Sequence, residues 1–187
     1  MAATTNETAA EERKSTIYTS PKGAQVGTLP PDRDTLPKAF LASVARFGDR
    51  VAMRKKRLGI WQEYTWRECY QHVRDFCLGL VSLGLKRGEK VAIIGENDPE
   101  FYWAEIAIHS AGGISTAIFT DAGPQELGYI VTNSDSVFLL AHDQEQCDKA
   151  LELRDQFPQV RKVIYWEERG LWNYNDPWLM SFEQVEE

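Results

Sequence analysis

Between residues 91 and 166, short apolar runs alternate with stretches that carry helical spacing. The run Val91–Ile94 is continuously apolar and mostly β-branched, which is typical of a strand covered on both faces. Further strands are expected at 114–119, 136–141 and 160–166. Helices are expected between them, at 98–111, 124–132 and 143–157. This alternation predicts an α/β fold in which crossover helices connect the strands of a parallel sheet.

Three further elements are predicted before this sheet. Apolar residues recur at mainly three- and four-residue spacing over 35–47, and Gly48 marks the end of that helix. Two short strand-like segments flank Leu58-Gly59, which predicts a β-hairpin over 51–64. The range 65–84 is predicted to be a helix that a Thr-x-x-Glu capping box begins and a glycine ends.

The first 34 residues have a different composition from the rest of the chain. They are rich in Ala, Thr, Glu and Pro and lack a sustained apolar period, so they cannot bury enough surface to offset their ordering entropy. We expect a disordered or extended tail over 1–34 and a partial domain over 35–187. Near the other end, 167–177 is predicted to be a loop, and Ser181 is expected to cap a helix that the chain end interrupts.

A chain of 187 residues with 43% hydrophobic residues can bury one sizeable core. No apolar run approaches the roughly 18 residues that a membrane-spanning helix needs. The N-terminal residues lack the features of a signal peptide and the acid-free, Arg-rich character of a transit peptide. Three cysteines without CxxC spacing favour neither a disulfide framework nor a thiolate metal site. We therefore expect a cytoplasmic protein without a transmembrane segment.

The formal net charge of −7 is unevenly distributed, because residues 141–187 carry five basic and eleven acidic side chains. A surface that binds nucleic acid needs clustered lysine and arginine. The one such cluster, Arg54–Arg57, lies in the predicted hairpin, where exposed lysines also protect strand edges from unwanted pairing. We therefore expect no nucleic-acid partner.

Three loops are candidates for phosphate binding. Gly79–Gly84 and Gly123–Gly128 have the glycine spacing of a Walker loop, but neither is followed by the lysine that contacts phosphate. The loop Gly95–Glu100 follows a predicted strand, where a doubly wound fold can hold a pyrophosphate. Its three carboxylates oppose an anion but suit the positive end of a helix dipole. We interpret this loop as structural capping, with Asp98 as N-cap and Pro99 in the first turn.

Other chemistry-bearing side chains fit structural roles. His72, His109 and His142 lack the short paired spacing of a metal site, and His109 fits a packing role within its helix. Cys77 lies on an apolar helical stripe and fits a small hydrophobe better than a nucleophile. Acidic residues are too numerous to single out an acid–base pair. We nominate no catalytic, cofactor-binding or metal-binding residue, and we expect most tryptophans, Trp61 among them, in the core.

Several ordered stretches resemble the opening of AMP-forming acyl-CoA synthetases, both in sequence and in spacing. They are Trp61–Glu68, Leu83–Ile93, Glu96–Glu100 and Ala111–Ser115. A further run, Arg169–Glu183, resembles the long-chain fatty acid–CoA ligase branch of that family. The chain departs from the family at Ala117 and Thr120, where prolines often follow the Gly-Gly strand.

The resemblance implies that the full-length enzyme activates a fatty acid with ATP to an acyl-adenylate and transfers the acyl group to CoA. Mg²⁺ is implied as the ion that stabilises the phosphates. The family's phosphate loop, adenylate-binding aspartate and catalytic lysine all lie C-terminal to the residues of this chain, so no catalytic residue can be carried over. We therefore expect the isolated chain to be inactive, to bind no cofactor, and to have the missing C-terminal portion as its main partner.

The leading interpretation is the N-terminal part of a long-chain fatty acid–CoA ligase, truncated before the phosphate loop. An aryl-CoA ligase or a peptide-synthetase adenylation domain is an alternative that the run Arg169–Glu183 argues against. A non-catalytic standalone interaction module derived from this family is the alternative from another class. A homo-oligomer, and peripheral membrane association of the full-length enzyme, are compatible with the leading interpretation.

Overall fold

The computed structural model describes residues 30–187, so the tail predicted for 1–34 lies almost entirely outside the described residues. Five strands form one parallel sheet in the order β4-β3-β5-β6-β7. They are β3 (Lys90–Ile94), β4 (Ile114–Ile118), β5 (Ser136–Ala141), β6 (Lys162–Tyr165) and β7 (Leu179–Ser181). The predicted α/β fold with a parallel sheet is confirmed.

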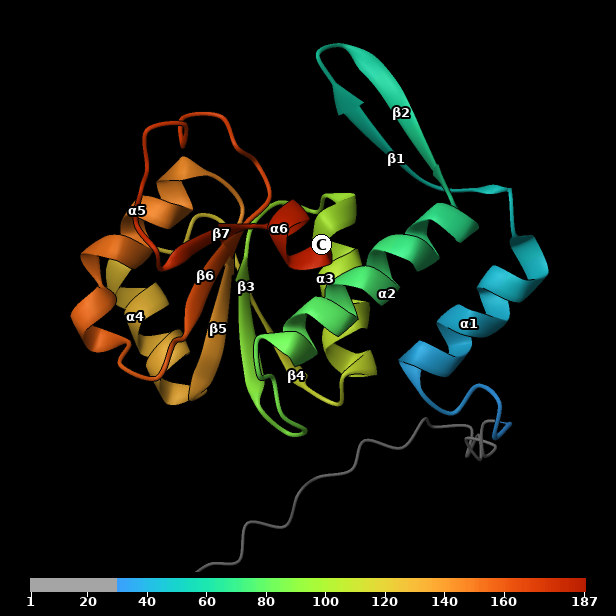
Figure 1. Cartoon of the computed structure of the whole chain (residues 1–187), viewed down its shortest axis with the longest axis horizontal. Helices are drawn as coiled ribbons and strands as arrows, with labels where there is room; N and C mark the ends of the chain where they lie inside the picture. Colours follow the sequence, from blue (N-terminus) through green and yellow to red (C-terminus); the bar gives the residue numbers. More distant parts are fainter. Residues whose placement is uncertain (1–29) are drawn as a thin grey trace, which may run out of the picture.

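Helices cover both faces of the sheet (Figure 1). One face carries α2 (Trp66–Ser82), α3 (Pro99–Ser110) and α6 (Phe182–Glu186), and α1 (Leu36–Phe47) packs against α2 and α3. The other face carries α4 (Pro124–Asn133) and α5 (Gln144–Glu152). Successive residues of β3 alternate between these two cores, with Val91 and Ile93 in the first and Ala92 and Ile94 in the second. The continuous apolar run of β3 follows from this two-sided burial.

An antiparallel hairpin precedes the sheet and projects from the helical layer (Figure 1). Its strands are β1 (Val51–Arg57) and β2 (Ile60–Thr65). The turn residues Leu58 and Gly59 both have positive φ, 50° and 83°, as a tight two-residue turn requires if it is to match the strand twist. At the end of β2, Thr65 and Glu68 form the predicted capping box that begins α2. The predicted hairpin and helix start are therefore confirmed.

Some details differ from the sequence predictions. The helix predicted over 143–157 ends at Glu152 and is followed by a 3-10 turn, Arg154–Gln156. Strand β7 was not predicted, because three residues carry no readable periodicity. Trp61 is exposed rather than buried, since the part of the hairpin that carries it has no helix packed over it. None of the described helices is long and apolar enough to cross a membrane.

Candidate functional site

Strands β3 and β5 are neighbours in the sheet, but the helices that follow them lie on opposite faces. The loops that leave the two strands therefore diverge, and they open a crevice at the carboxyl edge of the sheet. Open α/β sheets usually bind their ligands at such a crevice. In this chain the loop Gly95–Asp98 and the residue His142 lie there, directly after β3 and β5. This edge is the candidate functional site.

A network of polar side chains, here called the switch-point cluster, occupies the crevice. It consists of Lys55, Asp98, Glu100, His142 and Trp166. The Oδ2 atom of Asp98 lies 2.9 Å from Lys55 Nζ, 3.3 Å from His142 Nε2 and 3.3 Å from Trp166 Nε1. Lys55 Nζ also lies 3.1 Å from a carboxylate oxygen of Glu100. The four charged or titratable side chains are only 16–20% exposed, so the cluster is largely shielded from solvent.

The charges of the cluster compensate one another. Burial opposes ionisation of Asp98, but hydrogen bonds from His142 and Lys55, among others, outweigh it and lower the pKa of Asp98 to about 2. Burial also disfavours the charged form of His142, yet the hydrogen bond to Asp98 raises the pKa of this imidazole. The same balance raises the pKa of Lys55, where Asp98 and Glu100 outweigh burial. Asp98 thus favours positive charge on both bases, and Glu100 favours it on Lys55.

Local structure explains how these residues meet. Lys55 projects from the face of the hairpin that turns toward the sheet, whereas its neighbour Arg54 pairs with Glu63 on the other face, at 2.7 Å. The interpretation of Lys55 as an exposed edge lysine is therefore wrong. Asp98 occupies the N-cap position of α3, but its side chain makes no capping hydrogen bond. The predicted N-cap position of Asp98 and the first-turn position of Pro99 are confirmed, but the carboxylate of Asp98 binds the basic side chains of the cluster instead of a backbone amide of α3.

Gly95 is required where β3 enters the crevice. A Cβ atom at this position would lie 2.3 and 2.4 Å from two ring atoms of Trp166 and 2.9 Å from the Cβ of His142. The ring of Trp166 therefore packs directly on the backbone at Gly95, the residue that follows β3. It also stacks on the imidazole of His142, with the two ring centroids 5.1 Å apart. Because Gly95 has no side chain, the residues that follow β3, β5 and β6 can approach one another closely.

This arrangement braces the fold rather than leaving a reactive group free. The carboxylate oxygen of Asp98 already accepts from three donors, and Lys55 is shared between two carboxylates. A general base or a nucleophile needs an available lone pair beside open space. The cluster instead ties the hairpin to the loops after β3, β5 and β6.

Two cavities flank the cluster, and neither fits a phosphate group. A pocket of about 340 Å³ lies between the carboxyl ends of β3 and β4; Glu96 is its charged lining residue, and Phe101 and Phe119 contribute aromatic rings. A polar cavity of about 100 Å³ lies beneath the hairpin, where Lys55 and Arg57 face four glutamates. These glutamates are Glu100, Glu167, Glu168 and Glu183. The excess of negative charge opposes the phosphates of ATP and CoA.

A divalent cation is not accommodated either. Among residues 30–187, no three His, Cys, Asp or Glu side chains are grouped so that they could hold a metal ion. The carboxylates of the switch-point cluster are already neutralised by Lys55 and His142. The residues that the structure describes therefore do not fit the Mg²⁺ that the family resemblance implies.

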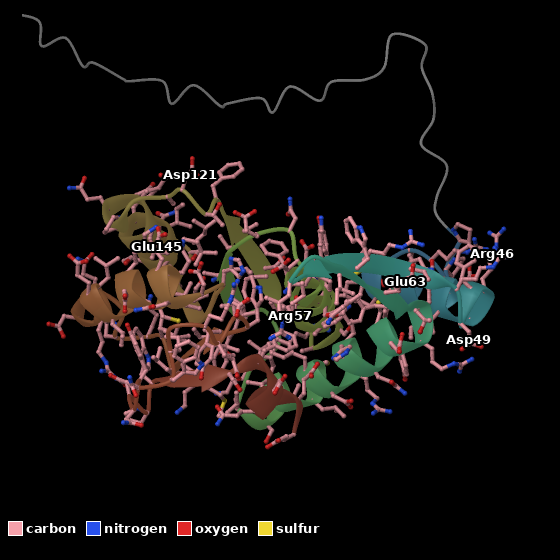
Figure 2. The ribbon with its side chains drawn as sticks, turned by 90° about the horizontal axis from the view of Figure 1, so that it is seen from above. Arg46, Asp49, Arg57, Glu63, Asp121 and Glu145 are labelled. Carbon is pink, nitrogen blue, oxygen red and sulfur yellow. The ribbon has the colours of Figure 1, made fainter. Side chains whose placement is uncertain are left out.

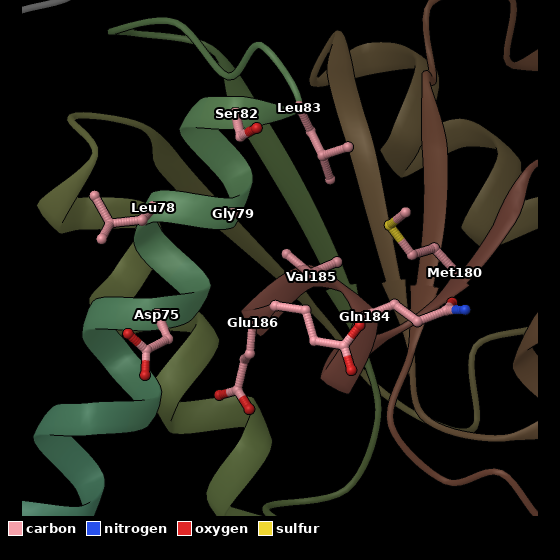
Figure 3. Close-up of a pocket in the computed structure, with 10 residues that line it drawn as sticks. Asp75, Leu78, Gly79, Ser82, Leu83, Met180, Gln184, Val185 and Glu186 are labelled. Carbon is pink, nitrogen blue, oxygen red and sulfur yellow. The ribbon is translucent and has the colours of Figure 1, made fainter.

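A larger pocket, of about 360 Å³, lies between α2 and α6 (Figure 3). Asp75, Met180 and Glu186 are among its lining residues, and Gly79 marks the close contact of the two helices. A Cβ at Gly79 would lie 1.7 Å from the carbonyl oxygen of Val185. This glycine therefore has a packing role, and the acidic rim gives the pocket no affinity for an anion.

The side chains that the sequence singled out have structural surroundings. His109 Nε2 lies 3.0 Å from Ser115 Oγ, which confirms the packing role. His72 stacks on Trp103 and pairs with Glu186 at 2.9 Å. Cys77 is half-buried, and burial raises the pKa of its thiol, as expected for a small hydrophobe. The three histidines do not come together.

Sequence reasoning missed the switch-point cluster itself. Lys55 and Asp98 lie in elements far apart in the chain, and no spacing rule links a hairpin lysine to a strand-end aspartate. One signal was present: His142 directly follows one predicted strand and Trp166 is the last residue of another, and the carboxyl ends of parallel strands meet at one edge of a sheet.

Known proteins give a consistent comparison. The family model described as "AMP-binding enzyme" matches residues 40–178. A long-chain-fatty-acid–CoA ligase of Homo sapiens is 30% identical over 134 residues, 72% of this chain and 18% of the relative. One of Xenopus laevis is 27% identical over 157 residues, 84% of this chain and 21% of the relative. The chain thus spans about a fifth of the length of these relatives.

Solved structures agree on the architecture. An anthranilate CoA ligase crystallised with anthranoyl-AMP superimposes with a TM-score of 0.70 at 20% identity. The match covers 80% of this chain and 27% of that one. At this identity the likeness concerns the fold, and it places the sheet and its helices within the architecture of adenylate-forming ligases.

Proposed function

The chain belongs to the AMP-binding enzyme family, and from that membership we propose that residues 35–187 form the N-terminal sheet subdomain of a long-chain fatty acid–CoA ligase. The observation that carries the proposal is the family match over 40–178, together with the 27–30% identity to long-chain-fatty-acid–CoA ligases. The residues at 1–34 lie before the matched region. The proposed activity joins a fatty acid to CoA at the expense of ATP.

We further propose that this subdomain contributes no catalytic, cofactor-binding or metal-binding side chain. Asp98 and Lys55 are charged side chains at the carboxyl edge of the sheet, and each is already paired within the switch-point cluster. The neighbouring cavities carry excess negative charge. ATP, CoA and Mg²⁺ are then bound in the proposed enzyme by residues that follow those of this chain, and the 187-residue chain alone is inactive.

The proposed partner is the C-terminal portion that the relatives have beyond the matched region. The edge strand β4 supports this, because its Ile114 is half exposed and Phe119, at its end, is almost fully exposed. Apolar side chains on an edge strand favour association when nothing covers them. We propose a cytoplasmic location with peripheral membrane contact, and a homo-oligomer as a further state of the uncovered chain.

A chimera tests the proposed function. The segment of the human relative that aligns with this chain is replaced by residues 35–187, and ATP-dependent formation of palmitoyl-CoA is measured beside that of anthraniloyl-CoA. We expect the chimera to retain about a tenth or more of the parent kcat/KM for palmitate and to discriminate against anthranilate. The human relative with the segment deleted is the inactive control.

A chimera that folds, as judged by a cooperative melting transition, but forms no palmitoyl-CoA would refute the proposal. Preference for anthranilate would favour the aryl-CoA ligase alternative. The standalone interaction module is favoured instead if the chimera is inactive while the isolated chain is a monomer that unfolds cooperatively and binds no hydrophobic dye.

A further inference from the structure

The tip of the β1–β2 hairpin exposes a group of large apolar side chains, here called the apolar tip. They are Leu58, Ile60 and Trp61, which are 89%, 70% and 62% exposed. The hairpin projects from the helical layer, with this turn at its far end (Figure 1). Three such side chains within four residues of one protrusion differ from the single exposed apolar residues that are common on soluble surfaces.

Cationic side chains surround the apolar tip. In the hairpin register Lys56 lies opposite Trp61, and Arg57 lies opposite Ile60. The ammonium of Lys56 is 6.0 Å from the centre of the Trp61 ring. Within residues 30–187, Lys56 forms no ion pair, whereas Arg57 lines the cavity beneath the hairpin that also contains four glutamates. Figure 2 shows Arg57 and Glu63 on the hairpin; Glu63 neutralises Arg54 at 2.7 Å, farther from the tip.

The switch-point cluster fixes the hairpin that carries this tip. Lys55 ties β1 to Asp98 and Glu100, and Tyr64 of β2 packs edge-on against Trp103 of α3 at 5.1 Å. A braced hairpin presents its tip with little loss of conformational freedom on binding. The tip is therefore a preorganised surface.

We propose that the apolar tip binds the interface of an anionic lipid bilayer, with Trp61 and its two neighbours among the acyl chains and Lys56 at the headgroups. Indole rings and long cationic side chains are the groups that settle at this depth. A basic residue near an anionic surface strengthens binding about fivefold. Such binding would give the peripheral membrane contact proposed above a site on this chain.

The shape of the tip favours a bilayer over a protein partner. A stable protein interface buries about 800 Å² on each partner, over roughly 20 residues. Three side chains at the end of a two-stranded ribbon are convex and cannot supply such an area, whereas a bilayer surface accommodates protruding side chains. The net charge of −7 opposes approach to an anionic membrane, but screening beyond about 8 Å leaves the cations of the tip as the nearest charges.

Vesicle sedimentation tests this proposal without any ligase substrate, so its outcome is separate from that of the chimera. The 187-residue chain is mixed with vesicles of phosphatidylcholine containing about 30% phosphatidylserine, and with phosphatidylcholine alone. We expect binding at least tenfold stronger to the anionic vesicles and weaker binding as salt is raised. The double variant Ile60→Ser, Trp61→Ser should lose at least tenfold, and Lys56→Glu at least fivefold.

Trp172 provides the matched control, because it is 78% exposed but lies in the loop between β6 and β7. Trp172→Ser should bind as the wild type does. Equal loss in Trp172→Ser and in the hairpin variant, or equal binding to both vesicle types, would overturn the proposal.

Fluorescence quenching by bromine-labelled phosphatidylcholine, mixed with phosphatidylserine, reports insertion directly. Trp61→Phe keeps an apolar ring, so it should still bind, but the quenching seen in the wild type should disappear. Trp172→Phe should leave that quenching in place. Undiminished quenching in a Trp61→Phe variant that sediments with vesicles would show that another surface enters the bilayer.

Discussion

The carboxylate of Asp98 lies 3.3 Å from the Nε2 atom of His142, and this contact joins the loops that leave β3 and β5. The two strands are neighbours whose helices lie on opposite faces, so the contact closes the crevice where an open α/β sheet usually receives its ligand. Lys55 completes the closure from the hairpin at 2.9 Å. These contacts give the carboxyl edge a structural role, and the contribution of each contact to stability can be tested.

Removal of the charge at Asp98 should destabilise the fold. Asp98→Asn leaves Lys55 and His142 without their shared anion in a largely shielded place, so we expect a loss of about 2 kcal/mol in the free energy of unfolding. Urea denaturation at neutral pH measures it.

Asp49 provides the matched control, because it pairs with Arg67 at 2.8 Å but is 81% exposed (Figure 2). Solvent screens such a pair, so Asp49→Asn should leave the urea midpoint unchanged. Equal destabilisation by the two substitutions would show that burial of the cluster contributes nothing.

Stability should fall as the pH rises from about 6.5. The pKa of His142 is raised in the folded chain, where Asp98 and Asp143 favour the imidazolium, although Lys55 opposes it. A raised pKa stabilises the fold below the unfolded value, and that contribution is lost as the pH passes through the folded value. The pKa of His72 is also raised, through Glu186. Urea midpoints from pH 5.5 to 8.5 would follow this decline.

Substitution by glutamine separates the two histidines. His142→Gln keeps a hydrogen-bond donor toward Asp98 but cannot titrate, so the decline of stability with pH should become shallower. His72→Gln should remove a further part of that decline. A wild-type stability that rises across this range, or a decline unchanged in both variants, would contradict the assignment.

In the acid range, Asp98 should contribute with the opposite sign. Its pKa is lowered to about 2, so its contribution is present above about pH 4 and is lost as the pH falls toward 2. The fall in stability over this interval should be smaller in Asp98→Asn than in the wild type. Identical acid profiles would be incompatible with an ionised Asp98 in the folded chain.

Substitution of Gly95 or Gly79 by alanine should lower the free energy of unfolding, because each glycine lies in close contact with another part of the chain. At Gly95 a methyl group meets the Trp166 ring, and at Gly79 it meets the backbone of Val185. We expect each alanine variant to lose about 2 kcal/mol of unfolding free energy, through displacement of Trp166 or of α6. Thermal melting of each variant at a series of urea concentrations measures this loss.

Gly123 is the control for both variants, since its φ is −72° and nothing lies within 4 Å of an added Cβ. Gly123→Ala should change stability by less than about 0.5 kcal/mol. If Gly79→Ala were as stable as Gly123→Ala, the tight contact of α2 with α6 would be disproved.

Elements with local signals were predictable from the sequence. The apolar run of β3, the Leu58-Gly59 turn and the Thr65 capping box each depend on neighbouring residues, and the structure confirms all three. Strand β7 and the pairing of Lys55 with Asp98 depend on tertiary register, which no local pattern encodes. The same limitation explains why the sequence identified Asp98 as the N-cap of α3 but not the partners of its carboxylate.

The exposure of Trp61 could not be predicted for a related reason. Strand periodicity identified the hairpin but not which of its parts a helix would cover. Tryptophans within regular elements are usually buried, and Trp103 in α3 and Trp166 directly after β6 follow that expectation. Trp61 departs from it, because it lies near the exposed tip of the hairpin.

We propose that compensating charges close the carboxyl edge of this sheet, so that the described residues there form no nucleotide site. Calorimetric titration of the 187-residue chain with ATP, with and without Mg²⁺, tests it most directly, and Asp98→Asn serves as a comparison in which one negative charge of the edge is removed. We predict no binding tighter than millimolar for the wild-type chain. Saturable binding of ATP at micromolar concentrations would contradict the account.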